Sequence, residues 1–124
     1  MNVVDSSGWL EYFADGPNAD FFAPPIEEIE SLIVPVISIY EVFKRICQQR
    51  SEGVALQAVA MMEQGEVVVL DAPLALSAAN LSLELKIPMA DSIILATARS
   101  YSATLWTQDA DFRGVEEVQY IEKA

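Results

Sequence analysis

The chain has 124 residues, of which 52% are hydrophobic, and its mean hydropathy of +0.27 indicates a compact globular domain and not a disordered segment. Its 7 Lys and Arg residues against 19 Asp and Glu residues give a net charge of −12, which repels nucleic acid unless cations or a basic partner offset it. The absence of histidine excludes Ser-His-Asp, Cys-His and histidine acid–base mechanisms, together with the usual zinc sites.

Other features bear on the compartment. The single cysteine, Cys47, excludes an internal disulfide and fits a reducing environment. No apolar run approaches the ~20 residues of a transmembrane helix. The N-terminus shows no basic region followed by an apolar stretch, as a signal peptide would. We therefore expect a cytoplasmic protein that does not associate with a membrane.

The N-terminal stretch Asn2-Val3-Val4-Asp5-Ser6-Ser7 predicts a short apolar strand that ends at an acidic residue. An apolar strand without alternation is typical of a strand buried on both faces, so we expect it in the middle of a parallel sheet. The spacing from Gly8 to Phe13 predicts a helix directly after it. Asp5 should then lie at the edge where open α/β sheets bind their ligands.

The rest of the chain alternates between predicted helices and strands. After a turn at residues 15–18, Pro24-Pro25 introduce a short acidic helix at residues 26–30. Strands are predicted at residues 31–35, 66–70, 103–107 and 118–121. Helices are predicted at residues 38–50, 54–64, 73–85 and 89–101, and a turn or short helix at 108–112. The pattern predicts one α/β domain, with a mostly parallel sheet of four to five strands and helices on both faces.

Several acidic residues occupy the same kind of position in this pattern. Asp5 follows the first strand, and Glu41 lies in the first turn of the helix after the second strand. Asp91 opens a helix, while Asp109 follows the fourth strand and precedes Asp111 by two residues. Strand C-termini and the N-termini of the following helices lie at one edge of a parallel sheet. We therefore expect these carboxylates to lie together.

Each acid also has a structural explanation when it is considered alone. Asp5 can cap the first helix, and Glu41 can be the partner of Ser38 in a capping box. Asp91 suits the positive end of a helix dipole. Asp109 can form an Asx turn, and the residue two positions later can be a plain surface acid. No single acid indicates a functional site, but their expected proximity at one edge of the sheet does.

A cluster of carboxylates repels itself unless a cation neutralises it. Oxygen ligands without His or Cys suit Mg²⁺ or Mn²⁺. One or two such ions can activate a water and stabilise the leaving oxygen in phosphodiester hydrolysis, without a side-chain base. The acids therefore predict a metal-dependent hydrolase.

Four segments carry these acids: Val3-Val4-Asp5-Ser6-Ser7, Ser38-Ile39-Tyr40-Glu41-Val42, Ala90-Asp91-Ser92-Ile93-Ile94-Leu95-Ala96-Thr97-Ala98 and Thr107-Gln108-Asp109-Ala110-Asp111-Phe112. In order and spacing they resemble the four acidic motifs of PIN domains, and most of all the VapC-type toxins of prokaryotic toxin–antitoxin pairs. The resemblance covers nearly the whole chain.

The resemblance implies a PIN-like nuclease domain over residues 1–124 that acts as a Mg²⁺- or Mn²⁺-dependent endoribonuclease on RNA. The positions that match the family's catalytic, metal-binding carboxylates are Asp5, Glu41, Asp91 and Asp109. Auxiliary positions are Ser6, Thr107 and Asp111. The resemblance further implies a homodimer and a cognate antitoxin, which inserts an extended or helical segment, often with a basic side chain, into the acidic groove.

Two other functional classes fit a domain of this size. A phosphoacceptor receiver domain should have paired acids after the first strand, a phosphorylatable Asp after the third and a Lys after the last. Asp71 does follow the third strand, but Asp5 is followed by Ser6-Ser7 and Lys123 is terminal, so the sequence does not favour this class. The other alternative is a PIN fold that serves as a binding module with weak or no catalysis. This alternative is supported by the small number of basic residues that could bind RNA, namely Lys44, Arg45, Arg50, Arg99 and Arg113.

Aromatic residues near the N-terminus give two further predictions. Trp9, Tyr12 and Phe13 have helical spacing and are expected in the core or on a dimer surface, and not as a base-stacking platform. Phe21-Phe22 are expected in a loop, either packed against the core or lining the groove.

Overall fold

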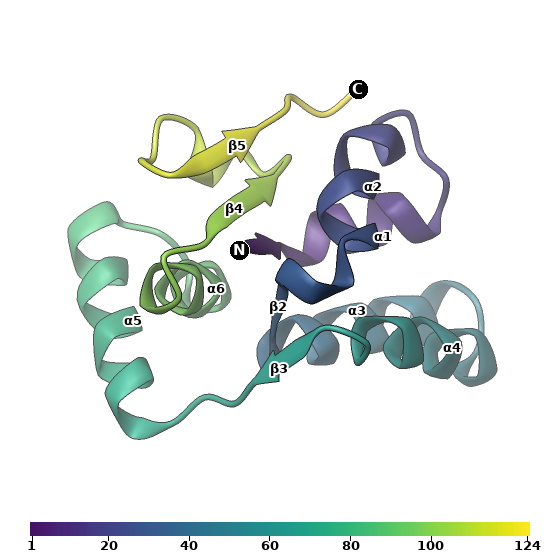
Figure 1. The fold of residues 1–124 in the computed structure, drawn as a ribbon, viewed down its shortest axis with the longest axis horizontal. Helices are drawn as coiled ribbons and strands as arrows, with labels where there is room; N and C mark the ends of the chain where they lie inside the picture. Colours follow the sequence, from purple (N-terminus) through teal and green to yellow (C-terminus); the bar gives the residue numbers. More distant parts are fainter.

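The computed structural model describes all 124 residues and contains five parallel strands in one sheet, in the order β3-β2-β1-β4-β5 (Figure 1). The strands are β1 Asn2–Val4, β2 Leu32–Pro35, β3 Glu66–Val68, β4 Thr104–Thr107 and β5 Val118–Tyr120. The predicted α/β class and the parallel sheet are confirmed.

The first strand lies at the centre of the sheet, as its unbroken apolar run predicts. Val3 of β1 is in register with Ile33 of β2 on one side and with Leu105 of β4 on the other. Val3 and Val4 are both fully buried, but they belong to different core clusters because successive side chains of a strand point to opposite faces. This double burial explains why β1 has no polar face.

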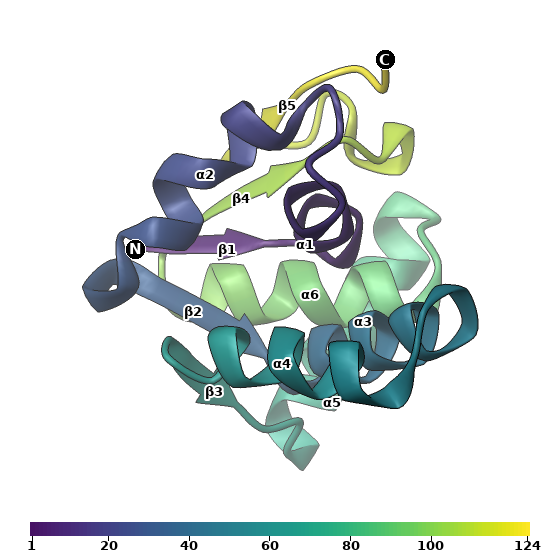
Figure 2. The same cartoon turned by 90° about the vertical axis from the view of Figure 1, so that its right-hand side faces the viewer.

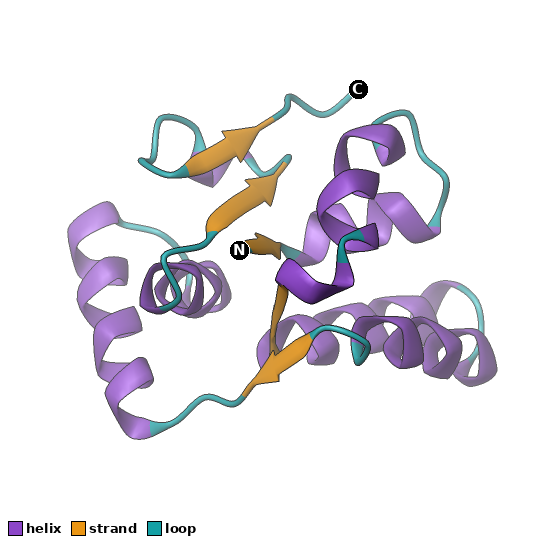
Figure 3. Ribbon diagram, viewed as in Figure 1, coloured by secondary structure: helices purple, strands orange, loops and turns teal.

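Helices cover both faces of the sheet (Figures 1, 2 and 3). One core cluster joins the strands to the first four helices: α1 Ser6–Phe13, α2 Ala19–Glu27, α3 Val36–Gln49 and α4 Glu52–Met62. The second cluster joins them to α6 Met89–Ser100, which also packs on α5 Ala72–Leu85. Two 3₁₀ turns, η1 Ile29–Ser31 and η2 Ala110–Phe112, complete the fold. None of the helices is both long enough and apolar enough to cross a membrane.

The predicted start of the third helix is wrong. The helix begins at Val36, with Pro35 as its N-cap, so Ser38 lies inside the first turn and does not cap it. The Ser38 hydroxyl is fully buried and makes no hydrogen bond. Glu41 is therefore not a capping-box partner, and its carboxylate is free to bind elsewhere.

The segment around the two prolines also differs from the prediction. Pro24 and Pro25 do not introduce a helix but lie inside α2, which begins five residues before Pro24, at Ala19. Phe21 and Phe22 are consequently helical and not in a loop. Phe22 is fully buried, and the Phe21 ring packs on Trp106 with centroids 5.2 Å apart. The expectation that these rings pack against the core is confirmed.

Gly8 of α1 fixes how closely the first helix approaches the sheet. A Cβ at this position would lie 2.6 Å from Phe22 Cε1 and 2.7 Å from Val4 Cγ1, and neither side chain is exposed. We expect Gly8→Ala to lower the free energy of unfolding by about 1–3 kcal/mol through overpacking. That loss exceeds the roughly 1 kcal/mol that alanine gains over glycine in helix propensity.

Chemical denaturation of Gly8→Ala and Gly53→Ala tests this expectation. Gly53 lies in α4, and a Cβ there would have only Ser51 Oγ nearby, at 4.0 Å. Gly53→Ala should therefore be neutral or stabilising. Equal midpoints for the two variants would show that the contact with Phe22 does not restrict α1.

Candidate carboxylate site

Asp5 ends β1 and caps α1, so its side chain is fixed where the central strand meets the first helix. Its Oδ1 accepts hydrogen bonds from the Gly8 backbone N–H at 2.9 Å and from the Ser7 hydroxyl at 2.8 Å. The Asp5 residue is only 2% exposed. The capping role considered from the sequence is confirmed, and the same carboxylate also faces the cavity described below.

Thr107 links this carboxylate to the end of the neighbouring strand. Its hydroxyl donates to Asp5 Oδ2 at 2.7 Å and accepts from the Asp109 backbone N–H at 2.9 Å. Asp109 in turn accepts the Asp111 backbone N–H at Oδ1, at 2.9 Å, which is the Asx-type turn predicted for it. Both hydrogen-bonding functions of the buried Thr107 hydroxyl are therefore used to orient acids.

Glu41 reaches the same edge from α3. Its Oε1 accepts a hydrogen bond from the Ser6 hydroxyl at 2.6 Å, across 35 residues of sequence. A short bond to a carboxylate of this kind is among the stronger hydrogen bonds in proteins. Ser6 and Thr107 thus each hold one carboxylate, at the two positions that the resemblance marks as auxiliary.

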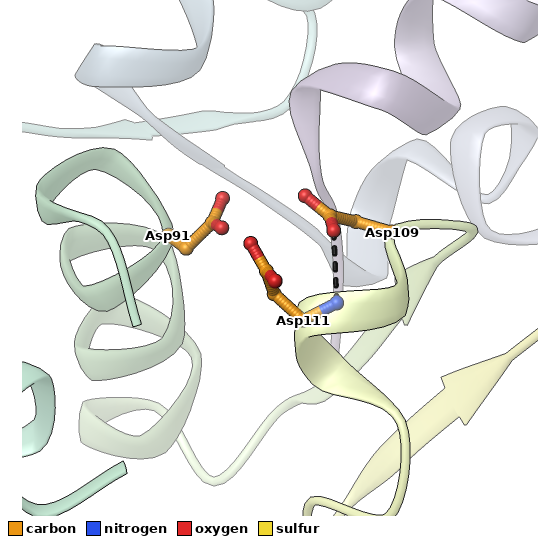
Figure 4. A group of neighbouring side chains, drawn as sticks. All are labelled: Asp91, Asp109 and Asp111. Carbon is orange, nitrogen blue, oxygen red and sulfur yellow. Dashed lines mark hydrogen bonds between the residues drawn. The ribbon is translucent and has the colours of Figure 1, made fainter. Parts of the chain in front are cut away.

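The oxygens of three other acids gather beside this pair. Asp91, in the first turn of α6, points toward Asp109 and Asp111, which lie after β4 (Figure 4). One carboxylate oxygen from each of the three lies within 4.8 Å of the others. Asp111 is exposed, while Asp91 and Asp109 are half-buried. Asp111 is therefore not an isolated surface acid.

A cavity of about 300 Å³ brings the two groups together. Its lining includes four of the acids predicted from the sequence, Asp5, Glu41, Asp91 and Asp109. Ser6 and Ser7 also line it, as does Arg45 of α3, which lies four residues after Glu41. The expected convergence at one edge of the sheet is thus what the structure contains. Asp111 contacts the cluster from outside this cavity.

Burial raises the pKa values of two of these acids, Asp5 and Asp91. Burial raises the pKa of Asp5 to about 6, against the lowering effect of its hydrogen bonds from Thr107, Gly8 and Ser7. Burial and then the negative charges of Asp109, Asp5 and Asp111 raise the pKa of Asp91 to about 7. A nearby cation would relieve both effects, since it favours the charged form of each carboxylate.

The donor set fits a hard divalent cation. All ligand atoms available in the cavity are carboxylate or hydroxyl oxygens, which suit Mg²⁺ and Mn²⁺ and do not suit zinc. Asp5 and Asp91, the two acids with elevated pKa values, are the ones whose charged forms such a cation would stabilise most.

Ser7 has a role that was not predicted from the sequence. The predicted supporting hydroxyl after Asp5 is that of Ser6, whereas Ser7 is the residue that donates a hydrogen bond to this carboxylate. Ser7 stands two residues after an acid that caps a helix. Its hydroxyl could have been assigned from that spacing, because helix-capping acids commonly have a polar residue within reach.

A match to a protein-family model identifies the family of this chain. The family model described as PIN domain matches residues 3–118. The chain belongs to the PIN domain family. The match leaves out only the two N-terminal and six C-terminal residues; the expected extent of the nuclease domain, residues 1–124, stays a prediction.

Solved structures with the same fold agree with the classification of this chain as a PIN domain. A toxin–antitoxin complex from Klebsiella pneumoniae matches with a TM-score of 0.81 and 20% identity, over 96% of each chain. VapC20 of Mycobacterium tuberculosis, described as a sarcin–ricin loop cleaving toxin, matches with a TM-score of 0.77 and 15% identity, over 94% of this chain and 95% of its own. FitAcB from Neisseria gonorrhoeae matches with a TM-score of 0.77 and 19% identity, over 98% and 97%. No curated protein sequence matches the chain significantly.

Proposed function

We propose that this PIN domain is a cytoplasmic Mg²⁺- or Mn²⁺-dependent endoribonuclease, and the toxin of a toxin–antitoxin pair. The observation that carries the proposal is the convergence of Asp5, Glu41, Asp91 and Asp109 around one cavity, with Asp111 beside them. Acids placed so close are costly without a cation, as the elevated pKa values of Asp5 and Asp91 indicate.

In this proposal the four cavity acids hold the metal, with Asp111 as an auxiliary acid. When bound, such ions activate a water and stabilise the leaving oxygen of a phosphodiester. The chain supplies the positioning: Thr107 and Ser7 fix Asp5, and Ser6 fixes Glu41. Arg45 lines the same cavity and can bind a substrate phosphate.

An antitoxin is part of the same proposal. The similar structures from Klebsiella pneumoniae, Rickettsia felis and Salmonella typhimurium are described as a toxin–antitoxin complex and as VapBC complexes. A net charge of −12 and an acidic cavity favour a partner segment with a basic side chain. Such a side chain would neutralise the acids and exclude the metal.

A homodimer is also proposed, and one face is suited to it. Between Ala72 and Leu83 the helix α5 has no charged residue, and Leu76 and Leu83 are 69% and 80% exposed. Two copies of a strongly acidic chain can approach closely only through an uncharged surface. The exposed apolar face of α5 meets that condition.

Mapping of new RNA ends tests the proposed activity. Purified protein, free of antitoxin, is incubated with total cellular RNA in the presence of Mn²⁺ or of excess chelator. We expect discrete cuts that require the metal, and their positions identify the target. Absence of cuts by a folded protein that binds Mn²⁺ would favour the alternative, a PIN-fold binding module with weak or no catalysis.

A further inference from the structure

The helix α3 is electrostatically unlike the rest of the chain. It carries Lys44 and Arg45 against one acid, Glu41, and Arg50 follows as its C-cap. None of the other five helices contains more basic than acidic residues. A cationic helix in a protein with a charge of −12 indicates a local requirement for an anion.

The cations of α3 form no ion pair within the protein. Lys44 and Arg45 are exposed, and the one ion pair in the structure joins Arg113 to Glu122, at 3.6 Å. Their charges are therefore free for an external anion. Arg45 lines the carboxylate cavity, so an anion bound there would lie beside the acids.

Tyr40 adds an aromatic ring to this surface. It is 60% exposed and is the one aromatic side chain of the chain that is exposed and not buried or half-buried. Lys44 Nζ lies 5.7 Å from the centroid of its ring. The Tyr40 hydroxyl makes no hydrogen bond within the protein, so the ring does not serve the fold through its polar end.

Helix geometry relates this ring to the residues of α3 that line the cavity. Glu41 and Arg45, four residues apart on α3, both line the cavity. Tyr40 and Lys44 precede them by one residue each, and residues four apart form a row along a helix. Successive residues of a helix point about 100° apart, so Tyr40 and Lys44 lie on the neighbouring face of α3 and do not themselves line the cavity.

We propose that Tyr40, Lys44 and Arg45 form a nucleotide-binding surface, on which one base of single-stranded RNA stacks on the Tyr40 ring while the two cations bind its neighbouring phosphates. The inference rests on the proposed function and specifies how that site would hold its substrate. An exposed aromatic ring among cations is the combination by which proteins bind unpaired nucleotides. Two of the seven Lys and Arg residues of this acidic chain, Lys44 and Arg45, belong to this surface, where they can offset part of the repulsion of RNA.

Two kinds of contact can be separated by their salt dependence. A phosphate contact releases counterions when it forms. Its loss therefore makes the negative slope of log K against log salt less steep, by about 0.7 for single strands. A stacking contact releases none. Removal of the ring should therefore weaken RNA binding with an unchanged slope, and removal of a cation should change the slope.

The experiment measures binding of a fluorescently labelled single-stranded RNA of mixed sequence by anisotropy, in Mg²⁺ and over a series of salt concentrations. All proteins carry Asp91→Asn so that the RNA stays intact. We expect Tyr40→Leu to weaken binding about tenfold, as loss of one stacked base does, and Tyr40→Phe to bind normally. Lys44→Gln and Arg45→Gln should each reduce the slope by about 0.7, whereas Lys123→Gln, an equal charge change at an exposed position near the C-terminus, should not.

A crosslinking experiment shows independently where RNA contacts the protein. RNA that contains 5-bromouridine is irradiated in complex with the Asp91→Asn protein, and the modified peptide is identified by mass spectrometry. We expect the crosslink at Tyr40. A crosslink confined to a peptide of another helix would overturn the inference.

The outcomes also separate this inference from the proposed function. If the wild-type chain cleaves RNA but the Tyr40, Lys44 and Arg45 variants bind it unchanged, the surface is wrong and the nuclease stands. If the wild-type chain neither binds nor cleaves RNA, both fail. If RNA binding is unchanged and binding of the cognate antitoxin is weakened, the surface belongs to the protein partner and the inference is overturned.

Discussion

Asp91→Asn is expected to lower the rate of metal-dependent RNA cleavage more than about 100-fold, since loss of an outer partner of a metal ligand alone costs about 10–100-fold. Asp91 is the residue through which α6 reaches the cluster, and its carboxylate lies within 4.8 Å of those of Asp109 and Asp111. The substitution removes a charge and an oxygen ligand while the side chain keeps its shape. Single-turnover cleavage of an RNA that carries the mapped site measures the loss.

The matched control for this variant is Asp71→Asn. Asp71 caps α5, accepting the Leu74 N–H at 2.9 Å, and asparagine caps helices about as well as aspartate. It makes the same charge change outside the carboxylate cavity and should leave cleavage within a few-fold of the wild-type rate. A wild-type rate for Asp91→Asn, with thermal unfolding unchanged, would remove Asp91 from the proposed ligands.

The metal-free protein is expected to lose stability as the pH rises from about 4 to about 8. The pKa of Asp5 is raised from 3.8 to about 6 in the folded protein, so the folded state binds more protons than the unfolded state between these values. Stability then falls with rising pH, since its slope follows the protons bound by the unfolded state minus those bound by the folded state. For Asp5 alone the shift corresponds to about 3 kcal/mol.

Asp91 acts in the same direction, because its pKa is raised to about 7. Asp91 is only partly buried, so its contribution is smaller than the shift alone would give. Asp91→Asn should therefore flatten the stability profile above pH 5 and stabilise the metal-free protein at pH 8. Millimolar Mn²⁺ should flatten the wild-type profile as well, because it binds the ionised acids of the folded state only.

Urea unfolding from pH 4 to pH 8, with chelator or with Mn²⁺, measures both effects. A stability that rises over this range in chelator would contradict the elevated pKa values. A profile in Mn²⁺ that follows the profile in chelator would contradict cation binding by the acids.

The edge at which the acids meet could be predicted from the sequence because topology fixes it. Alternating strands and helices give a parallel sheet with right-handed crossovers, and all strands then end on one side. Asp5 and Asp109 follow two such strands. Asp91 lies in the first turn of a helix whose N-terminus is on the same side. Their convergence needs no knowledge of side-chain packing.

The partners of these acids were harder to predict because they are set by tertiary contacts. Glu41 is bonded by Ser6, 35 residues away, and the local pattern with Ser38 pointed to a capping box that does not form. The continuation of α2 through Pro24-Pro25 has the same origin. Phe22 and Ile26 bury their side chains in the core, and that packing outweighs the low helix propensity of proline.

The hydrogen bond from Thr107 to Asp5 has a consequence for protein synthesis. It joins residues 102 positions apart, and β4, which carries Thr107, is next to last among the strands. N-terminal segments leave the ribosome first, so a nascent chain that stops before β4 has neither the donor that holds Asp5 nor Asp109 and Asp111. Incomplete translation products therefore cannot assemble the carboxylate cavity, and any activity of this site can arise only when the polypeptide is nearly complete.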